Sequence, residues 1–120
     1  MIDSGAKLIR KLDKRSVRHD AAFWFYYPDT QEWKLVLAEV KVDKQGTKEV
    51  YREIQTVLSK FSQYIGDLSL DNIAVSKMDA PIVSLLRIAI RTGPGISGIR
   101  FRNNVINGTV IEDAYIYRLN

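Results

Sequence analysis

The sequence contains no cysteine and only one histidine, His19. The absence of cysteine excludes disulfides, thiolate metal sites and cysteine nucleophiles. A lone histidine excludes a histidine-rich zinc site and any catalytic site that needs two imidazoles. His19 precedes Asp20 directly, so on a strand the two side chains point to opposite faces. That alternation does not support a Ser-His-Asp arrangement.

Long apolar runs are also missing. No run approaches the roughly 18 residues of a membrane span, and the N-terminus MIDSGAKLIRK has no signal-peptide core. We therefore expect a cytoplasmic location and no membrane partner. The 120 residues, 46% apolar and 27% charged, predict one globular domain over residues 1–120. The net charge of +4 permits contact with phosphates but does not demonstrate it.

The stretch from Arg18 to Asp43 is dense in aromatic and β-branched residues. Its composition predicts two long strands joined by a tight turn over residues 28–31. A pair between Tyr27 and Glu32 sets the register. Apolar residues on both faces predict central strands that other elements cover on both sides.

The remaining elements follow from periodicity and from turn residues. An amphipathic helix over 3–15, capped by Asp3 or Ser4, precedes the hairpin. Helices are predicted over 47–65 and within 76–93, the second capped by Asp79 and closed by Gly93, with a short strand over 73–75 between them. The dipeptide Asn107-Gly108 predicts a C-terminal hairpin. The order α-β-β-α-β-α-β-β predicts an α/β domain with a mixed sheet and helices on both faces.

The base of the first hairpin carries a charged cluster of Asp20, Glu39 and Lys41. The predicted register sets Asp20 opposite Glu39, and Lys41 shares their face. Two carboxylates and a lysine suit metal-assisted phosphodiester hydrolysis, in which Asp20 and Glu39 hold Mg²⁺ and Lys41 orients the attacking water. The alternative is a set of solvated ion pairs, which contribute little to stability.

At these positions the chain resembles the PD-(D/E)xK nuclease superfamily. The matching residues are Asp20 and the Glu39-Val40-Lys41 motif, followed by the helix predicted over 47–65. The resemblance implies a Mg²⁺-dependent nuclease with Asp20, Glu39 and Lys41 as catalytic residues. It covers roughly residues 3–65.

A second group of residues lies beyond the helix predicted within 76–93. Residues 93–98 match G-x-G-x-x-G, but they follow a predicted helix and precede a strand. A dinucleotide fingerprint needs the opposite arrangement, so this segment is better interpreted as a helix stop and turn. Its glycines, nearby arginines and an amide-rich strand edge form a candidate partner-binding set: Arg87, Arg91, Gly95, Gly98, Arg100, Arg102, Asn103 and Asn104.

Three functions are compatible with these patterns. The leading hypothesis is a small basic binding or accessory module, without catalysis, that contacts a protein or a nucleic acid through the candidate partner-binding set. The second is the Mg²⁺-dependent nuclease. The third is a structural homo-oligomer that pairs through the C-terminal hairpin.

Overall fold

The structure is a computed structural model that describes residues 1–15, 17–40 and 47–120. Its strands are β1 (Ala21–Tyr27), β2 (Glu32–Ala38), β3 (Ile73–Ser76), β4 (Ile99–Ile106) and β5 (Thr109–Leu119). Its helices are α1 (Ile2–Lys14), α2 (Thr47–Lys60), α3 (Ser62–Ile65), the 3₁₀ turn η1 (Leu70–Asn72) and α4 (Pro81–Ala89). Apart from α3 and η1, this is the predicted order. Within the described ranges, no helix combines the length and the apolar character needed to cross a bilayer.

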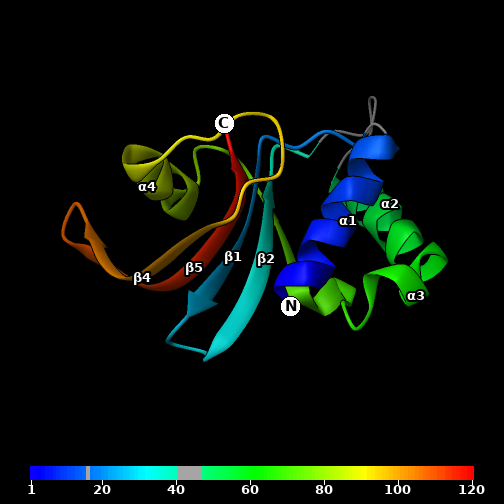
Figure 1. The fold of residues 1–120 in the computed structure, drawn as a ribbon, viewed down its shortest axis with the longest axis horizontal. Helices are drawn as coiled ribbons and strands as arrows, with labels where there is room; N and C mark the ends of the chain where they lie inside the picture. The colour runs from blue at the N-terminus through cyan, green and yellow to red at the C-terminus, as the bar shows by residue number, and fades with distance from the viewer. Residues whose placement is uncertain (16, 41–46) are drawn as a thin grey trace.

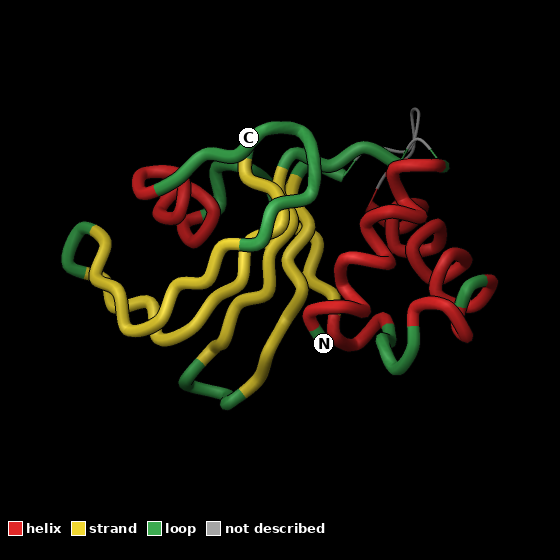
Figure 2. The backbone as a smooth tube through the Cα atoms, viewed as in Figure 1, coloured by secondary structure: helices red, strands yellow, loops and turns green. Residues whose placement is uncertain are grey.

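The strands form one mixed sheet of order β3-β2-β1-β5-β4. Strands β2 and β3 are parallel, and the other neighbouring pairs are antiparallel. Helices α1, α2 and α3 lie on one side of the sheet and α4 lies on the other (Figures 1 and 2). The predicted α/β class, with helices on both faces, is confirmed.

The first hairpin has the predicted register, from the Tyr27–Glu32 pair to the Ala21–Ala38 pair. Its two faces fill two separate cores, as the alternation of its apolar residues requires. Phe23 and Val36 belong to the core under α4, whereas Trp24 and Leu35 belong to the core under α1 and α2. A fully covered pair of central strands explains why both faces are apolar.

The base of this hairpin differs from the prediction. The ladder ends at Ala38, and Glu39 has a left-handed backbone with φ of 53°. The N–H of Glu39 donates to the carbonyl of Ser76 instead of continuing the β1–β2 ladder. This break reverses the alternation, so that Val40 packs against the α1-side core and not beside Val36 and Ala38.

The helix ends were predicted less well than the helices themselves. Helix α1 begins after Met1 without a side-chain cap, so the capping roles of Asp3 and Ser4 were wrong. The helix predicted over 47–65 is interrupted at Phe61. Helix α4 begins after Ala80 with Pro81 in its first turn, and it ends before Ile90, earlier than predicted, because Ile90 is extended.

The C-terminal hairpin turns at Asn107 and Gly108, whose φ values of 48° and 78° are those of a type I′ turn. The register that this turn predicts is confirmed from the Ile106–Thr109 pair to the Phe101–Ala114 pair, except at Asn103. Asn103 has φ of 51° and does not pair with Glu112. The left-handed Asn103 thus divides β4 into a proximal segment over 99–102 and a distal segment over 104–106.

Candidate functional site

Strand β4 ends the sheet, since β5 is its single neighbour in the strand order. It is eight residues long, and Arg102, Asn103, Asn104 and Val105 are all exposed. The hairpin that it forms with β5 extends away from α1, α2 and α3 (Figure 1). An exposed edge strand presents unpaired backbone groups that can pair with another strand.

The other edge of the sheet is protected. Strand β3 has only four residues, and the N–H of Val75 donates to the hydroxyl of Tyr51, at 3.0 Å. That bond occupies a backbone donor that a sixth strand, added beside β3, would need. The two edges therefore differ in length and in covering, and β4 is the edge that can accept a strand.

The hairpin register identifies which groups of β4 face outward. In a two-residue hairpin the pair that flanks the turn is hydrogen-bonded, and bonded pairs then alternate along the ladder. Ile106 flanks the turn opposite Thr109. Asn104 therefore directs its backbone groups toward β5, whereas Val105 directs its own toward solvent. The left-handed Asn103 resets this alternation, because Phe101 faces the same α4-side core as Ile106. Since side-chain face and backbone direction alternate together along a strand, Phe101 directs its backbone groups toward β5 and Arg102 directs its own toward solvent.

Two arginines of β4 share one carboxylate. Arg100 donates to both oxygens of Asp113, at 2.7 and 2.8 Å, and these hydrogen bonds hold the pKa of Asp113 below its ordinary value. Arg102 Nε lies 3.8 Å from Asp113 Oδ2, and its side chain is 66% exposed. Arg102 is thus the cation of this pair that remains available to a partner.

An apolar pair stands near the tip of the same hairpin. Val105 and Val110 are directly opposite each other, and they are 65% and 63% exposed. Their neighbours Ile106 and Ile111 point the other way, into the core under α4. Sequence reasoning placed the two valines in register but did not predict their exposure. The signal was their position two residues outside the Asn107-Gly108 turn. There the hairpin extends beyond helices α1, α2 and α3, which lie on the face of the sheet opposite to α4.

The candidate partner-binding set is divided between two faces of the sheet. Arg87 and Arg91 lie on and just after α4. The Arg100 guanidinium lies on the opposite face, 6.0 Å from the ring of Trp33, which belongs to the α1-side core. The set therefore does not form one continuous surface. Arg100, Arg102, Asn103 and Asn104 remain together on β4.

The two glycines of the set differ in their surroundings. A Cβ at Gly95 would meet nothing within 4 Å, whereas one at Gly98 would press on the side chain of Tyr115. The loop that contains them is fastened to β5, since Ser97 N–H donates to Tyr117 O and Thr92 N–H donates to Leu119 O. Before β4 begins, this loop therefore lies along the outer edge of β5 and binds its backbone at Tyr117 and Leu119.

Two residues of the predicted catalytic cluster, Asp20 and Glu39, lie at the end of the sheet near the C-terminus. Asp20 is exposed, and its N–H donates to Ala38 O. Glu39 Oε1 accepts the N–H of Met78 at 3.1 Å, so this carboxylate holds the segment that leads to α4. Lys41 lies outside the described residues. Among the described residues, no three acidic or histidine side chains are grouped so that they can hold a metal ion.

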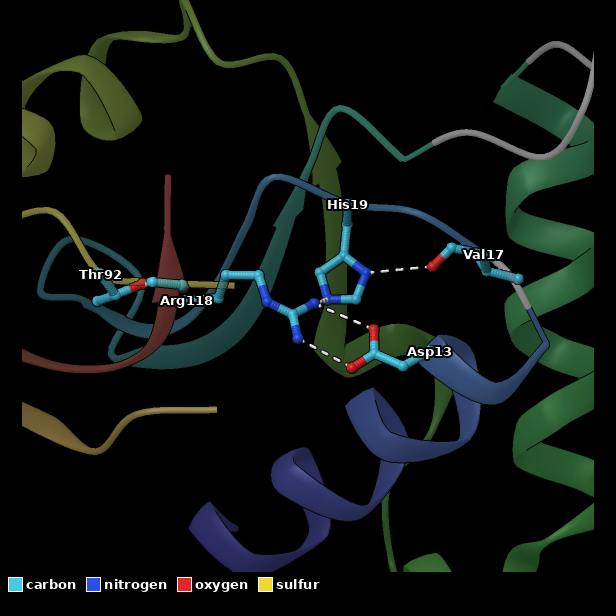
Figure 3. A network of polar contacts seen from close by, with 6 residues as sticks. Asp13, Val17, His19, Thr92 and Arg118 are labelled. Atoms are coloured by element: carbon cyan, nitrogen blue, oxygen red, sulfur yellow. Dashed lines mark hydrogen bonds and ion pairs between the residues drawn. The ribbon is translucent and has the colours of Figure 1, made fainter. Parts of the chain in front are cut away.

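A buried polar network occupies the same end of the molecule (Figure 3). Arg118 Nη1 contacts Nε2 of His19 at 2.8 Å, and the guanidinium also binds the carboxylate of Asp13. Beside this network is a 270 Å³ pocket whose lining includes Arg18, Asp20 and Pro94. The Arg118 charge is already balanced by Asp13, so the network primarily joins α1, β5 and the segment before β1.

A hollow with a volume of 760 Å³ runs along α2. Polar side chains that line it are bonded within the helix: Gln55 to Ser59, Thr56 to the carbonyl of Arg52, and Arg52 to Glu49. Such groups are not directed at a ligand. The hollow lacks the convergent polar groups of a ligand site.

Comparisons of the chain with protein-family models, with curated proteins and with solved structures find no match. Arguments about function therefore depend on the geometry described above.

Proposed function

We propose that this chain is a non-catalytic binding module that recruits a protein by adding one of its strands to the free edge of β4. The observation that carries this proposal is the open edge over residues 102–105, in contrast to the covered edge at β3. In β-strand addition, main-chain hydrogen bonds supply affinity and alternate side chains supply specificity. The outward backbone groups of Arg102 and Val105 supply the main-chain hydrogen bonds.

A protein partner fits the hairpin better than a nucleic acid does. Interfaces for nucleic acids carry a surplus of positive charge that displaces counterions. Here Arg100 is already bound to Asp113, Glu112 is exposed nearby, and the tip carries two exposed valines. A mixed surface of amides, apolar side chains and balanced charges is typical of protein interfaces.

Self-association through β4 is disfavoured in the two antiparallel registers that are centred on Phe101 and on Arg102. A two-fold axis that passes through Phe101 sets Arg100 of one copy opposite Arg102 of the other. An axis that passes through Arg102 sets this residue opposite itself. Like charges directly opposite each other destabilise a strand pair. We therefore expect the partner to be a different protein.

Position-specific photo-crosslinking in the native host tests this proposal. A photoreactive amino acid at Asn104 is expected to give a discrete adduct with one protein. The same amino acid at Asp71, beside the β3 edge, is expected to give none. Both positions are exposed, so accessibility does not explain the difference.

Two variants at Val105 separate the backbone contribution from the side-chain contribution. Val105→Pro removes an outward N–H, and proline is tolerated where this group faces solvent. Val105→Ser keeps the N–H and removes the apolar side chain. The adduct at Asn104 is expected to disappear with proline and to persist, at lower yield, with serine. An adduct that proline does not affect, or no adduct at Asn104, would contradict strand addition.

A further inference from the structure

We infer that the strand received by β4 carries an acidic residue opposite Arg102, next to an apolar residue opposite Phe101. This inference rests on the proposed function and specifies the chemistry of its partner. It follows from three features of the edge: the direction of its backbone groups, the sharing of Asp113, and the alternation of its side chains.

The backbone directions make Arg102 a close neighbour of the incoming strand. Because Arg102 directs its own N–H and C=O toward solvent, it forms a hydrogen-bonded pair with an antiparallel strand on the outer side. In such pairs the Cα atoms are about 5.5 Å apart, and the two side chains lie on the same face of the sheet. The side chain of the partner residue therefore lies directly beside that of Arg102.

The charges across the sheet favour an acid at that position. Asp113, Arg102 and the partner residue form one row across three strands, because Arg102 pairs with Asp113. Asp113 is already bound by Arg100 through both oxygens, so it does not fully balance Arg102. A carboxylate on the outer side completes an alternation of sign in this row, and opposite charges on neighbouring strands attract.

The neighbouring position requires an apolar residue. Phe101 points to the other face, where it packs half-buried against the core under α4. A strand laid beside β4 would place a side chain next to this ring. Aromatic and β-branched residues pair well with Phe across a ladder. The recognised segment is thus extended, with acidic and apolar residues in alternation.

Three synthetic peptides test the charge of the central position. Each is an acetylated and amidated heptapeptide of alternating valine and threonine, and its central residue is glutamate, glutamine or lysine. Titration into ¹⁵N-labelled protein is followed through the amide signals of Arg102 and Val105. We expect the glutamate peptide to bind about two- to fivefold more tightly than the glutamine peptide, and the lysine peptide to bind least.

Charge reversal supplies the matched control. Arg102→Glu is expected to invert the order, so that the lysine peptide binds most tightly. Arg102 is exposed, and its substitution leaves the fold intact, which the remaining amide signals report. The reversal distinguishes a pairwise contact from a general preference for acidic peptides.

The other outcomes separate this inference from the proposed function. Equal binding of all three peptides, reported by the amides of Arg102 and Val105, would overturn the acidic partner and leave strand addition standing. If no peptide bound but the adduct at Asn104 still formed, the acidic partner would be overturned and strand addition would stand. If a single-stranded oligonucleotide shifted the same amides, with an affinity that falls steeply with salt, the partner would be a nucleic acid and both would be overturned.

Discussion

Arg118 near the end of β5 binds Asp13 near the end of α1 through two hydrogen bonds, of 3.1 and 2.9 Å. The two residues are 105 positions apart in the chain. The arginine side chain is only 7% exposed, whereas that of Asp13 is 40% exposed. The pair fastens the first helix to the last strand, and the buried guanidinium depends on this carboxylate for its charge balance.

Asp13→Asn is therefore expected to destabilise the fold. Removing one partner of a fully buried ion pair costs about 3–5 kcal/mol. Because water reaches the Asp13 carboxylate, we expect a smaller loss, about 1–3 kcal/mol in the free energy of unfolding. Chemical denaturation measures this value.

Asp3→Asn is the matched control for that substitution. Asp3 is on the same helix and pairs with Lys7, but its side chain is 78% exposed. Exposed pairs contribute about 0–1 kcal/mol. Similar losses for the two variants would show that the burial of Arg118 does not matter.

The single histidine gives the fold a dependence on pH. Burial of the ring, reinforced by the charge of Arg118, lowers the pKa of His19 below 6.5, although Asp13 and Asp20 oppose this shift. The unfolded chain therefore binds the proton more tightly than the native protein does. The contribution of His19 to stability is fully present above pH 6.5, and it is lost as the pH falls from 6.5 toward the lowered native pKa.

Two measurements test this dependence. Because the chain has one histidine, a single imidazole signal in an NMR titration reports the native pKa. Unfolding by denaturant between pH 5 and 7 is expected to show a slope no steeper than about 1.4 kcal/mol per pH unit for one proton. His19→Gln is expected to flatten that slope. A native pKa at or above 6.5 would refute the prediction.

At Gly5, helix α1 lies close against the side chains of the sheet. An added Cβ would lie 2.7 Å from Nε1 of Trp24, and closer still to the hydroxyl of Tyr117. These two groups share a buried hydrogen bond of 3.0 Å. Alanine gains up to about 1 kcal/mol in helix propensity. The overpacking and the strained hydrogen bond outweigh this gain, so Gly5→Ala is expected to lose about 1–3 kcal/mol.

Gly95→Ala controls for the change of residue type. Nothing lies within 4 Å of a Cβ at Gly95, and its effect on the free energy of unfolding is expected to stay within about 0.5 kcal/mol. Differential scanning calorimetry of the two variants compares them directly. A neutral Gly5→Ala would mean that the helix shifts to accommodate the methyl group.

The parts of the fold that the sequence predicted well depend on local or alternating patterns. Turn residues at 28–31 and at Asn107-Gly108 set both hairpin registers, because side-chain alternation leaves few pairings that bury the apolar faces. The helices were found from their periodicity. Their ends were not, since Met1 and Ala80 precede α1 and α4 without capping side chains. Packing decided those boundaries.

The parts that the sequence did not predict depend on residues far apart in the chain. No local pattern indicates that β5 inserts between β1 and β4, which is what leaves β4 at the edge. The same holds for the Arg118–Asp13 contact. The polar character of Arg102, Asn103 and Asn104 did predict an exposed strand edge. The left-handed conformation of Glu39 was missed, since glutamate seldom adopts it.

Glu39 decides between the nuclease hypothesis and a structural role. The Glu39 carboxylate accepts a hydrogen bond from the N–H of Met78. Glu39→Ala removes this acceptor and is expected to lower the free energy of unfolding by about 0.5–1.5 kcal/mol. Glu39→Gln keeps an acceptor oxygen and is expected to restore most of that stability. The nuclease hypothesis instead requires the carboxylate, so both variants would lose Mg²⁺-dependent cleavage. Incubating the wild type and both variants with single- and double-stranded DNA and RNA distinguishes the two roles. We expect no cleavage by any of the three proteins, whereas wild-type cleavage that both variants lose would establish the enzyme.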